Sequence, residues 1–75
     1  MTKPGDALEL SVIAPCYNEQ DNVAVLVERM LATFDRMAVS AELVLVDDGS
    51  SDQTWTRIQE AMAVHSRVLG ARPPP

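Results

Sequence analysis

The amino-acid sequence predicts an α/β fold in which strands and helices alternate in the order β-α-β-α, with a short third strand to follow. Two apolar runs, at 8–14 and 43–46, each precede a segment whose apolar residues recur every three or four positions. Short strands separated by helices imply parallel pairing with right-handed crossovers. The sequence therefore predicts half of a doubly wound parallel sheet.

The composition indicates a small globular domain or part of a larger one. The chain has 75 residues, of which 47% are hydrophobic, and this excludes a disordered class. The net charge of −5 and the scattered basic residues argue against nucleic-acid binding. A single cysteine excludes an internal disulfide, and without a signal peptide we expect a cytoplasmic protein. No apolar run approaches the ~20 residues of a membrane helix.

The first strand is expected at 8–14 and the first helix from Asn18 to about Met37. The run LELSVIA becomes continuously apolar, as in a mostly buried strand, and stops at Pro15, which cannot donate to a sheet ladder. Asn18 is a favoured N-cap, and acidic residues follow it in the predicted first turn. The helix should be amphipathic because one face carries Val23, Leu26, Val27, Met30, Leu31, Phe34 and Met37.

The second strand is expected at 43–46, and Gly49 breaks it. Ser50 and Gln53 fit a capping box at the start of a second helix, which should run to about His65. The residues expected to be structural rather than ligand-binding are Cys16, Asp52, Trp55 and His65, together with the four methionines.

The domain plan has three parts. Residues 1–7 form a polar tail, residues 8–70 form the partial α/β domain, and residues 71–75 form a proline-rich end. The third strand would begin at 68–69, and the closing prolines would stop any further regular structure.

Two adjacent acids lie at the end of the second strand, where they are not expected to stabilise the fold. Asp47 and Asp48 follow a buried run directly, although like charges repel. Ligands of open parallel sheets bind beyond the carboxyl ends of the strands, where Tyr17 offers a face for a nucleotide base. Asp48 can accept from a ring N–H of uracil or guanine, and free backbone N–H groups at Asn18 suit phosphate oxygens. A nucleotide pocket is predicted, with a helix-capping loop as the alternative.

The two motifs together resemble family 2 glycosyltransferases of the GT-A fold. They are SVIAPCYNE at 11–19 and LVLVDDGSSDQT at 43–54, separated by one amphipathic helix. The resemblance covers about 8–70 and implies the N-terminal half of a Rossmann-like GT-A sheet, truncated. Within the family, PCYNE together with D-x-T-W is most similar to the polyprenyl-phosphate sugar transferases of the dolichol-phosphate mannosyltransferase type.

The resemblance implies roles for five residues in a nucleotide-sugar site. Pro15, Tyr17 and Glu19 would line the site, with Tyr17 against the base and Glu19 near the base or ribose. Asp48 would accept from the base, and Asp47 would support that loop. The parent enzyme would move a sugar from a UDP- or GDP-sugar to an acceptor, for this subgroup a polyprenyl phosphate at the cytoplasmic face of the membrane.

Family members also use a divalent metal, Mg²⁺ or Mn²⁺, bound through a later D-x-D motif that offsets the charge of the departing diphosphate. That motif and the catalytic base do not occur in the sequence, so we expect neither a metal site nor a catalytic residue here, and no activity of the chain alone. Residues 71–75 replace the basic, Asn-rich stretch typical of the family. Two alternatives remain: a receiver-like non-catalytic α/β module and a nonfunctional truncated product.

Overall fold

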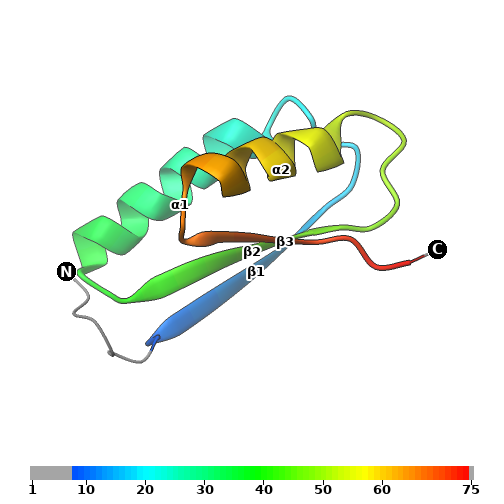
Figure 1. Cartoon of the computed structure of the whole chain (residues 1–75). Coiled ribbons are helices and arrows are strands. Elements are labelled where there is room, and N and C mark those ends of the chain that lie inside the picture. Colours follow the sequence, from blue (N-terminus) through cyan, green and yellow to red (C-terminus); the bar gives the residue numbers. More distant parts are fainter. Residues whose placement is uncertain (1–7, 75) are drawn as a thin grey trace.

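The computed structural model describes residues 8–74 and confirms the predicted alternation of strands and helices (Figure 1). The predicted polar tail, 1–7, lies outside the described residues. The elements are β1 (Leu10–Cys16), α1 (Val23–Met37), β2 (Ala41–Asp47), α2 (Thr54–Val64) and β3 (Val68–Ala71).

The three strands form one parallel sheet in the order β1-β2-β3. Cys16, the last residue of β1, pairs in register with Asp47, the last residue of β2, and Val46 pairs with Ala71 of β3. All three strands therefore end at the same edge. Both helices cover the same face of the sheet (Figure 1), as expected when two crossovers of one hand step in the same direction.

The core lies between the two helices and the face of the sheet that they cover. Leu43 and Leu45 of β2 and Ile58 of α2 have no exposed surface. The other buried apolar residues are Cys16, Val23, Val27, Leu31, Phe34, Ala41 and Val68. The aromatic ring of Trp55 and two methionines, Met30 and Met62, pack partly buried against this core, as predicted. Met37 is 56% exposed, so it is not part of this core.

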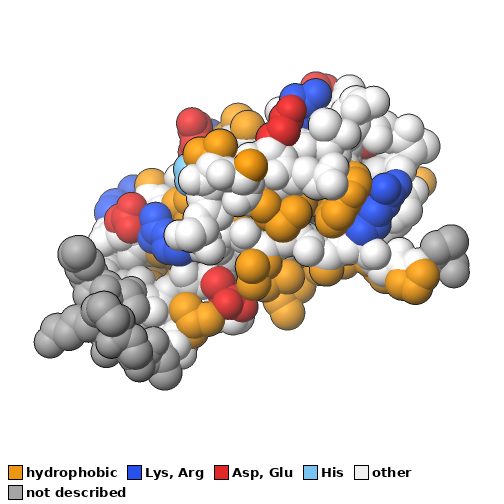
Figure 2. Space-filling model, in the orientation of Figure 1, with side chains coloured by type: hydrophobic (Ala, Val, Ile, Leu, Met, Phe, Trp, Pro, Cys, Tyr) orange, Lys and Arg blue, Asp and Glu red, His pale blue; other side chains and the backbone are white. Residues whose placement is uncertain are grey.

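The opposite face of the sheet is uncovered within the described residues. Ile13 is 67% exposed and Leu69 46% exposed, and Figure 2 shows hydrophobic side chains gathered beneath the strands, away from the helices. The prediction of a mostly buried first strand is therefore wrong for one of its two faces. The residues of β1 that point toward the helices are Val12, Ala14 and Cys16.

The first strand also runs further than predicted, because Pro15 lies within β1 rather than ending it. The carbonyl oxygen of Cys16 accepts from the N–H of Asp48, and the N–H of Leu10 donates to Ser40, so these residues direct their backbone groups toward β2. Successive residues of a strand direct these groups to opposite sides, so the nitrogen of Pro15 points away from β2. Proline is tolerated there because no ladder bond is lost.

Both helices begin later than predicted. Helix α1 begins at Val23, and its N-cap is Asn22 rather than Asn18, which has a left-handed backbone with φ 51°. Helix α2 begins at Thr54. The predicted ends hold: α1 ends at Met37, and His65 is the C-cap of α2.

Gly70 of β3 provides a test of how closely α2 packs on the sheet. A Cβ atom at this position would lie 2.6 Å from Cγ2 of the fully buried Ile58. We expect Gly70→Ala to lower the free energy of unfolding by about 1–3 kcal/mol, the usual cost of overpacking. Urea denaturation of the 75-residue chain measures the change.

The matched rescue is Ile58→Leu, which removes the Cγ2 branch while conserving volume. The double variant should lose less stability than the sum of the two single variants. Strict additivity would show that the helix does not press on this strand.

Candidate functional site

The predicted site residues lie at the edge where the strands end. Tyr17 follows β1 and Asp48 follows β2, and the N–H of Asp48 donates to the carbonyl oxygen of Cys16 at 3.3 Å. The segments that follow β1 and β2 extend from the same end of the sheet (Figure 1). The expectation that both motifs meet at the carboxyl edge agrees with this arrangement.

Side-chain oxygens of one loop accept from backbone N–H groups of the other. The N–H of Asn18 donates to Ser50 Oγ at 2.9 Å, and the N–H of Glu19 donates to Thr54 Oγ1 at 2.8 Å. In return, the N–H of Ser51 donates to Asn18 Oδ1 at 3.0 Å. We call this set of bonds the loop clasp. It also includes the N–H of Gln20 to Asp52 Oδ2 and the N–H of Gln53 to Gln20 Oε1.

The loop clasp overturns two local predictions. The N–H groups of Asn18, Glu19 and Gln20 are already bonded to the second loop, so they are not free for phosphate oxygens. The capping box is also wrong, because the Ser50 hydroxyl accepts from Asn18 and the N–H of Gln53 donates to Gln20. Ser, Asn and Asp side chains can bond to nearby backbone groups, as in a helix cap, but here their partners are in the other loop.

The two adjacent acids have different environments. Asp47 has no exposed surface, and its Oδ1 accepts from the N–H of Ser50 at 3.0 Å. Asp48 is exposed. Gly49 follows with φ 80°, a left-handed conformation that glycine adopts without strain and that turns the chain toward Ser50. One carboxylate is therefore committed to the loop, and the other is presented to solvent.

The other predicted site residues are also at the surface. Tyr17 is 62% exposed, so its ring is accessible at the edge. Glu19 is exposed, and its Oε2 accepts from Asn22 Nδ2 at 2.7 Å. Pro15 is exposed on the face of the sheet that the helices leave uncovered. The structure thus brings Tyr17, Glu19 and Asp48 to one edge and sets Pro15 on an adjoining face.

Two side chains at this edge have shifted pKa values. Burial, assisted by the charges of Glu19 and Asp47, raises the pKa of the Cys16 thiol above its ordinary value, which fits the predicted buried filler. The Thr54 hydroxyl bonded to the Asp52 carboxylate, with backbone N–H groups, lowers the pKa of Asp52. Asp52 is a turn residue of the loop clasp just before α2, so the prediction of a first-turn acid is close but misplaced.

Sequence reasoning missed the roles of Asn18, Ser50, Thr54 and Asp52 as clasp residues. The sequence did contain a signal for these roles. The two loops together have more Ser, Thr, Asn and Asp side chains than two helix caps require. It also missed Arg72, whose Nε lies 3.5 Å from Asp47 Oδ2.

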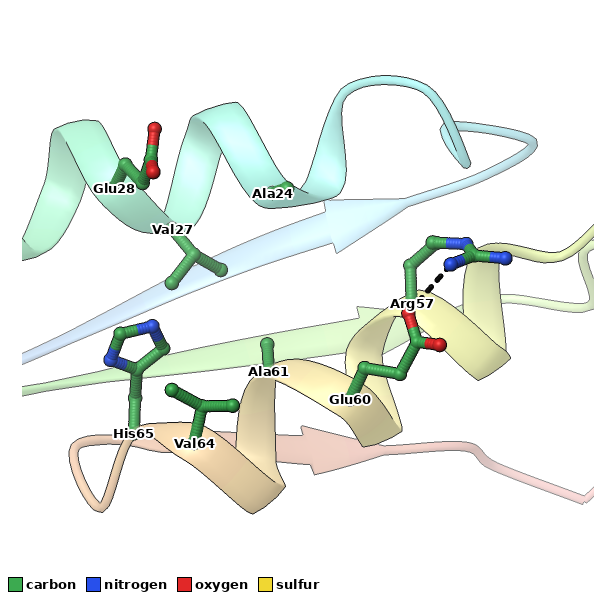
Figure 3. Close-up of a pocket in the computed structure, with 8 residues that line it drawn as sticks. All are labelled: Ala24, Val27, Glu28, Arg57, Glu60, Ala61, Val64 and His65. Atoms are coloured by element: carbon green, nitrogen blue, oxygen red, sulfur yellow. Dashed lines mark hydrogen bonds and ion pairs between the residues drawn. The ribbon is translucent and has the colours of Figure 1, made fainter.

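A shallow hollow lies elsewhere, between the two helices (Figure 3). Val27 of α1 and Ala61 of α2 line its floor, and Glu28 and His65 lie at its rim. None of the five predicted site residues lines it. The hollow is therefore separate from the candidate site.

Residues 8–74 contain neither a cluster of metal-binding side chains nor a membrane-spanning helix. No group of three His, Cys, Asp or Glu side chains in this part of the chain could hold a metal ion. Neither α1 nor α2 is long and apolar enough to cross a membrane.

Comparison with known proteins identifies the family. The sequence model described as Glycosyl transferase family 2 matches residues 11–72, which include both loops and the carboxyl ends of all three strands. The chain belongs to this family. The predicted GT-A resemblance is thereby confirmed at the level of the family.

Two curated relatives have names that combine a polyprenyl phosphate with a sugar, one as a transferase and one as a synthase. The chain is 48% identical over 52 residues to undecaprenyl-phosphate 4-deoxy-4-formamido-L-arabinose transferase of Edwardsiella ictaluri, covering 69% of the chain and 16% of the relative. It is 47% identical over 51 residues to dodecaprenyl-phosphate galacturonate synthase of Rhizobium johnstonii, covering 68% of the chain and 15% of the relative. The chain thus spans about one sixth of the length of these relatives.

Thr54 lies at the centre of the loop clasp and has no exposed surface. We expect Thr54→Val to keep the shape but lower the free energy of unfolding by about 1–3 kcal/mol, because the N–H of Glu19 loses its acceptor. The exposed Thr56 of α2 provides the matched control, Thr56→Val. Equal effects of the two substitutions would contradict the clasp.

The same comparison has a defined pH dependence. The pKa of Asp52 is lowered in the folded chain, so its contribution to stability is present above its ordinary pKa and is lost as pH falls through the folded value. The stability difference between wild type and Thr54→Val should therefore shrink below about pH 4. Urea denaturation at a series of pH values measures this difference.

The thiol of Cys16 should react slowly in the folded chain. The pKa of this thiol is raised and its side chain is buried. We therefore expect iodoacetamide to alkylate Cys16 at least about tenfold more slowly in the folded chain than in the urea-unfolded chain, both at pH 8. Mass spectrometry over time gives both rates. Equal rates would show that the edge of the sheet is open.

Proposed function

We propose that this chain forms the nucleotide-recognising part of a sugar transferase that uses a UDP- or GDP-sugar as donor and a polyprenyl phosphate as acceptor. One observation carries the proposal. Tyr17 and Asp48 are exposed on two adjacent loops whose backbones are held together by the loop clasp, at the edge where parallel sheets bind ligands. The family match and the name of the Edwardsiella ictaluri transferase support the reaction class.

Each of the two residues suits one part of a nucleotide base. The Tyr17 ring provides an apolar face for stacking, and aromatic stacking of a base contributes about 1–3 kcal/mol. The Asp48 carboxylate provides an acceptor for the ring N–H that uracil and guanine share. Glu19 adds a second carboxylate near the same loop, where a ribose hydroxyl could donate to it.

The remaining parts of the reaction are assigned to the longer relatives' segments that this chain does not match. The carboxylates at the edge, such as those of Glu19 and Asp48, cannot offset the negative charge of a diphosphate, and residues 8–74 include no metal ligand set. We therefore expect this chain to transfer no sugar by itself. The divalent metal and the placement at the cytoplasmic face of a membrane belong to the proposal for the whole enzyme.

A chimera tests the proposal in a complete fold. Residues 11–72 replace the matched segment of the Edwardsiella ictaluri transferase, and calorimetry measures affinity for UDP, GDP, their nucleosides and their sugar conjugates. The proposal would be overturned if the parent transferase binds a uracil or guanine nucleotide and the chimera binds neither.

In that chimera, Asp48→Asn should weaken binding by roughly 1–2 kcal/mol, because a neutral amide oxygen accepts more weakly than a carboxylate. The loss should be the same for nucleoside, nucleoside diphosphate and nucleotide-sugar, since the contact is to the base. Tyr17→Ala should also weaken all three ligands. The matched control is Asp21→Asn, an exposed acid in the turn before α1; a loss as large as that of Asp48→Asn would indicate a general charge effect.

A further inference from the structure

The buried carboxylate of Asp47 lacks one hydrogen bond. Its Oδ1 accepts from the N–H of Ser50, but Oδ2 has no hydrogen-bond partner within residues 8–74, and the residue has no exposed surface. An unpaired charged oxygen in such a place is costly unless an opposite charge compensates it. A compensating group is therefore expected close to Oδ2.

Arg72 is that group. Its Nε lies 3.5 Å from Asp47 Oδ2, and its guanidinium carbon lies 5.7 Å from the centre of the Trp55 ring. Arg72 directly follows β3, where Ala71 pairs with Val46, so it stands beside Asp47 at the carboxyl edge. The Trp55 ring on one side and the carboxylate on the other fix the plane of the guanidinium.

We propose that Arg72 is a positioning residue for base recognition, which holds the loop that presents Asp48 by compensating the buried charge of Asp47. The inference deepens the proposed function and rests on it. Arg72 does not contact the base in this assignment. It acts through Asp47, and the Arg72 side chain as a whole is 48% exposed.

The route from Arg72 to the loops begins with its ion pair to Asp47 and continues through consecutive hydrogen bonds. Asp47 Oδ1 accepts from the N–H of Ser50, Ser50 Oγ accepts from the N–H of Asn18, and Asn18 Oδ1 accepts from the N–H of Ser51. If Asp47 loses its counter-charge, its carboxylate gains by turning toward water. That rotation would break the bond to Ser50 and release the first link of the loop clasp.

An ordinary surface ion pair would not have this effect. Arg57 and Glu60 on α2 form a closer pair, at 2.6 Å, but both side chains are substantially exposed, and such pairs contribute little. The difference at Asp47 is the complete burial of the acid. Arg57→Gln is therefore the matched control for Arg72→Gln.

The test measures amide hydrogen exchange by NMR on the 75-residue chain and, separately, its affinity for UDP, GDP and the corresponding nucleosides. Arg72→Gln should speed exchange at the Ser50 and Asn18 amides about tenfold, because the bonds that protect them open more often. The amide of Leu43, which donates to Arg67 away from this edge, should be unaffected. Affinity for nucleoside and nucleoside diphosphate should fall by the same factor.

The double variant Arg72→Gln with Asp47→Asn distinguishes charge compensation from packing. Removing the uncompensated charge should return Ser50 exchange to within about threefold of wild type, since the amide oxygen can still accept from Ser50. No rescue would assign Arg72 to packing on Trp55 and overturn the proposal. So would unchanged exchange in Arg72→Gln, or a loss of affinity confined to the diphosphates, which would mean a phosphate contact.

The proposed function can fail separately. If the unsubstituted chain and the chimera bind no nucleoside or nucleotide, the proposed function is wrong, and with it the purpose assigned to Arg72. The exchange rates would still decide whether Arg72 holds the loop.

Discussion

The edge of the sheet depends on how the backbone N–H groups of the first loop are satisfied. A chain that leaves a strand exposes donors that must find acceptors or water. Here Asn18 and Glu19 donate to the hydroxyls of Ser50 and Thr54 across more than thirty residues of sequence. Because β1 and β2 end in register, at Cys16 and Asp47, the two loops leave the sheet side by side and can meet these needs for each other.

This division leaves the side chains of two candidate binding residues, Tyr17 and Asp48, without structural duties. Asn18, Ser50 and Thr54 keep the loops in place, whereas Tyr17 and Asp48 lie between or beside them and remain exposed. A rigid base under accessible side chains lowers the entropy that a ligand must overcome when it orders its site. The bonded amides of Asn18, Glu19 and Gln20 are not available as donors to a phosphate.

The sequence predicted the order of the elements well because apolar periodicity depends only on neighbours along the chain. It predicted the helix starts poorly, because Asn18 and Ser50 carry the same side-chain oxygens whether they cap a helix or bond a distant loop. The exposure of Ile13 could not be predicted from local sequence either. It results from the strand order, which places both helices on the other face of the sheet. The candidate residues Tyr17 and Asp48 were found through motifs, whereas Arg72 has no motif and depends on the register of β3.

The positions of the Asp47 and Asp48 side chains explain how two adjacent acids can be accommodated. Successive residues of an extended chain point to opposite sides, so one carboxylate enters the helix-covered layer and the other reaches solvent, where water screens their repulsion. Structure requires only the first, which accepts from Ser50 and faces Arg72. Nothing in the described fold requires a carboxylate at the second position. That freedom is the strongest structural reason to seek its purpose in a ligand.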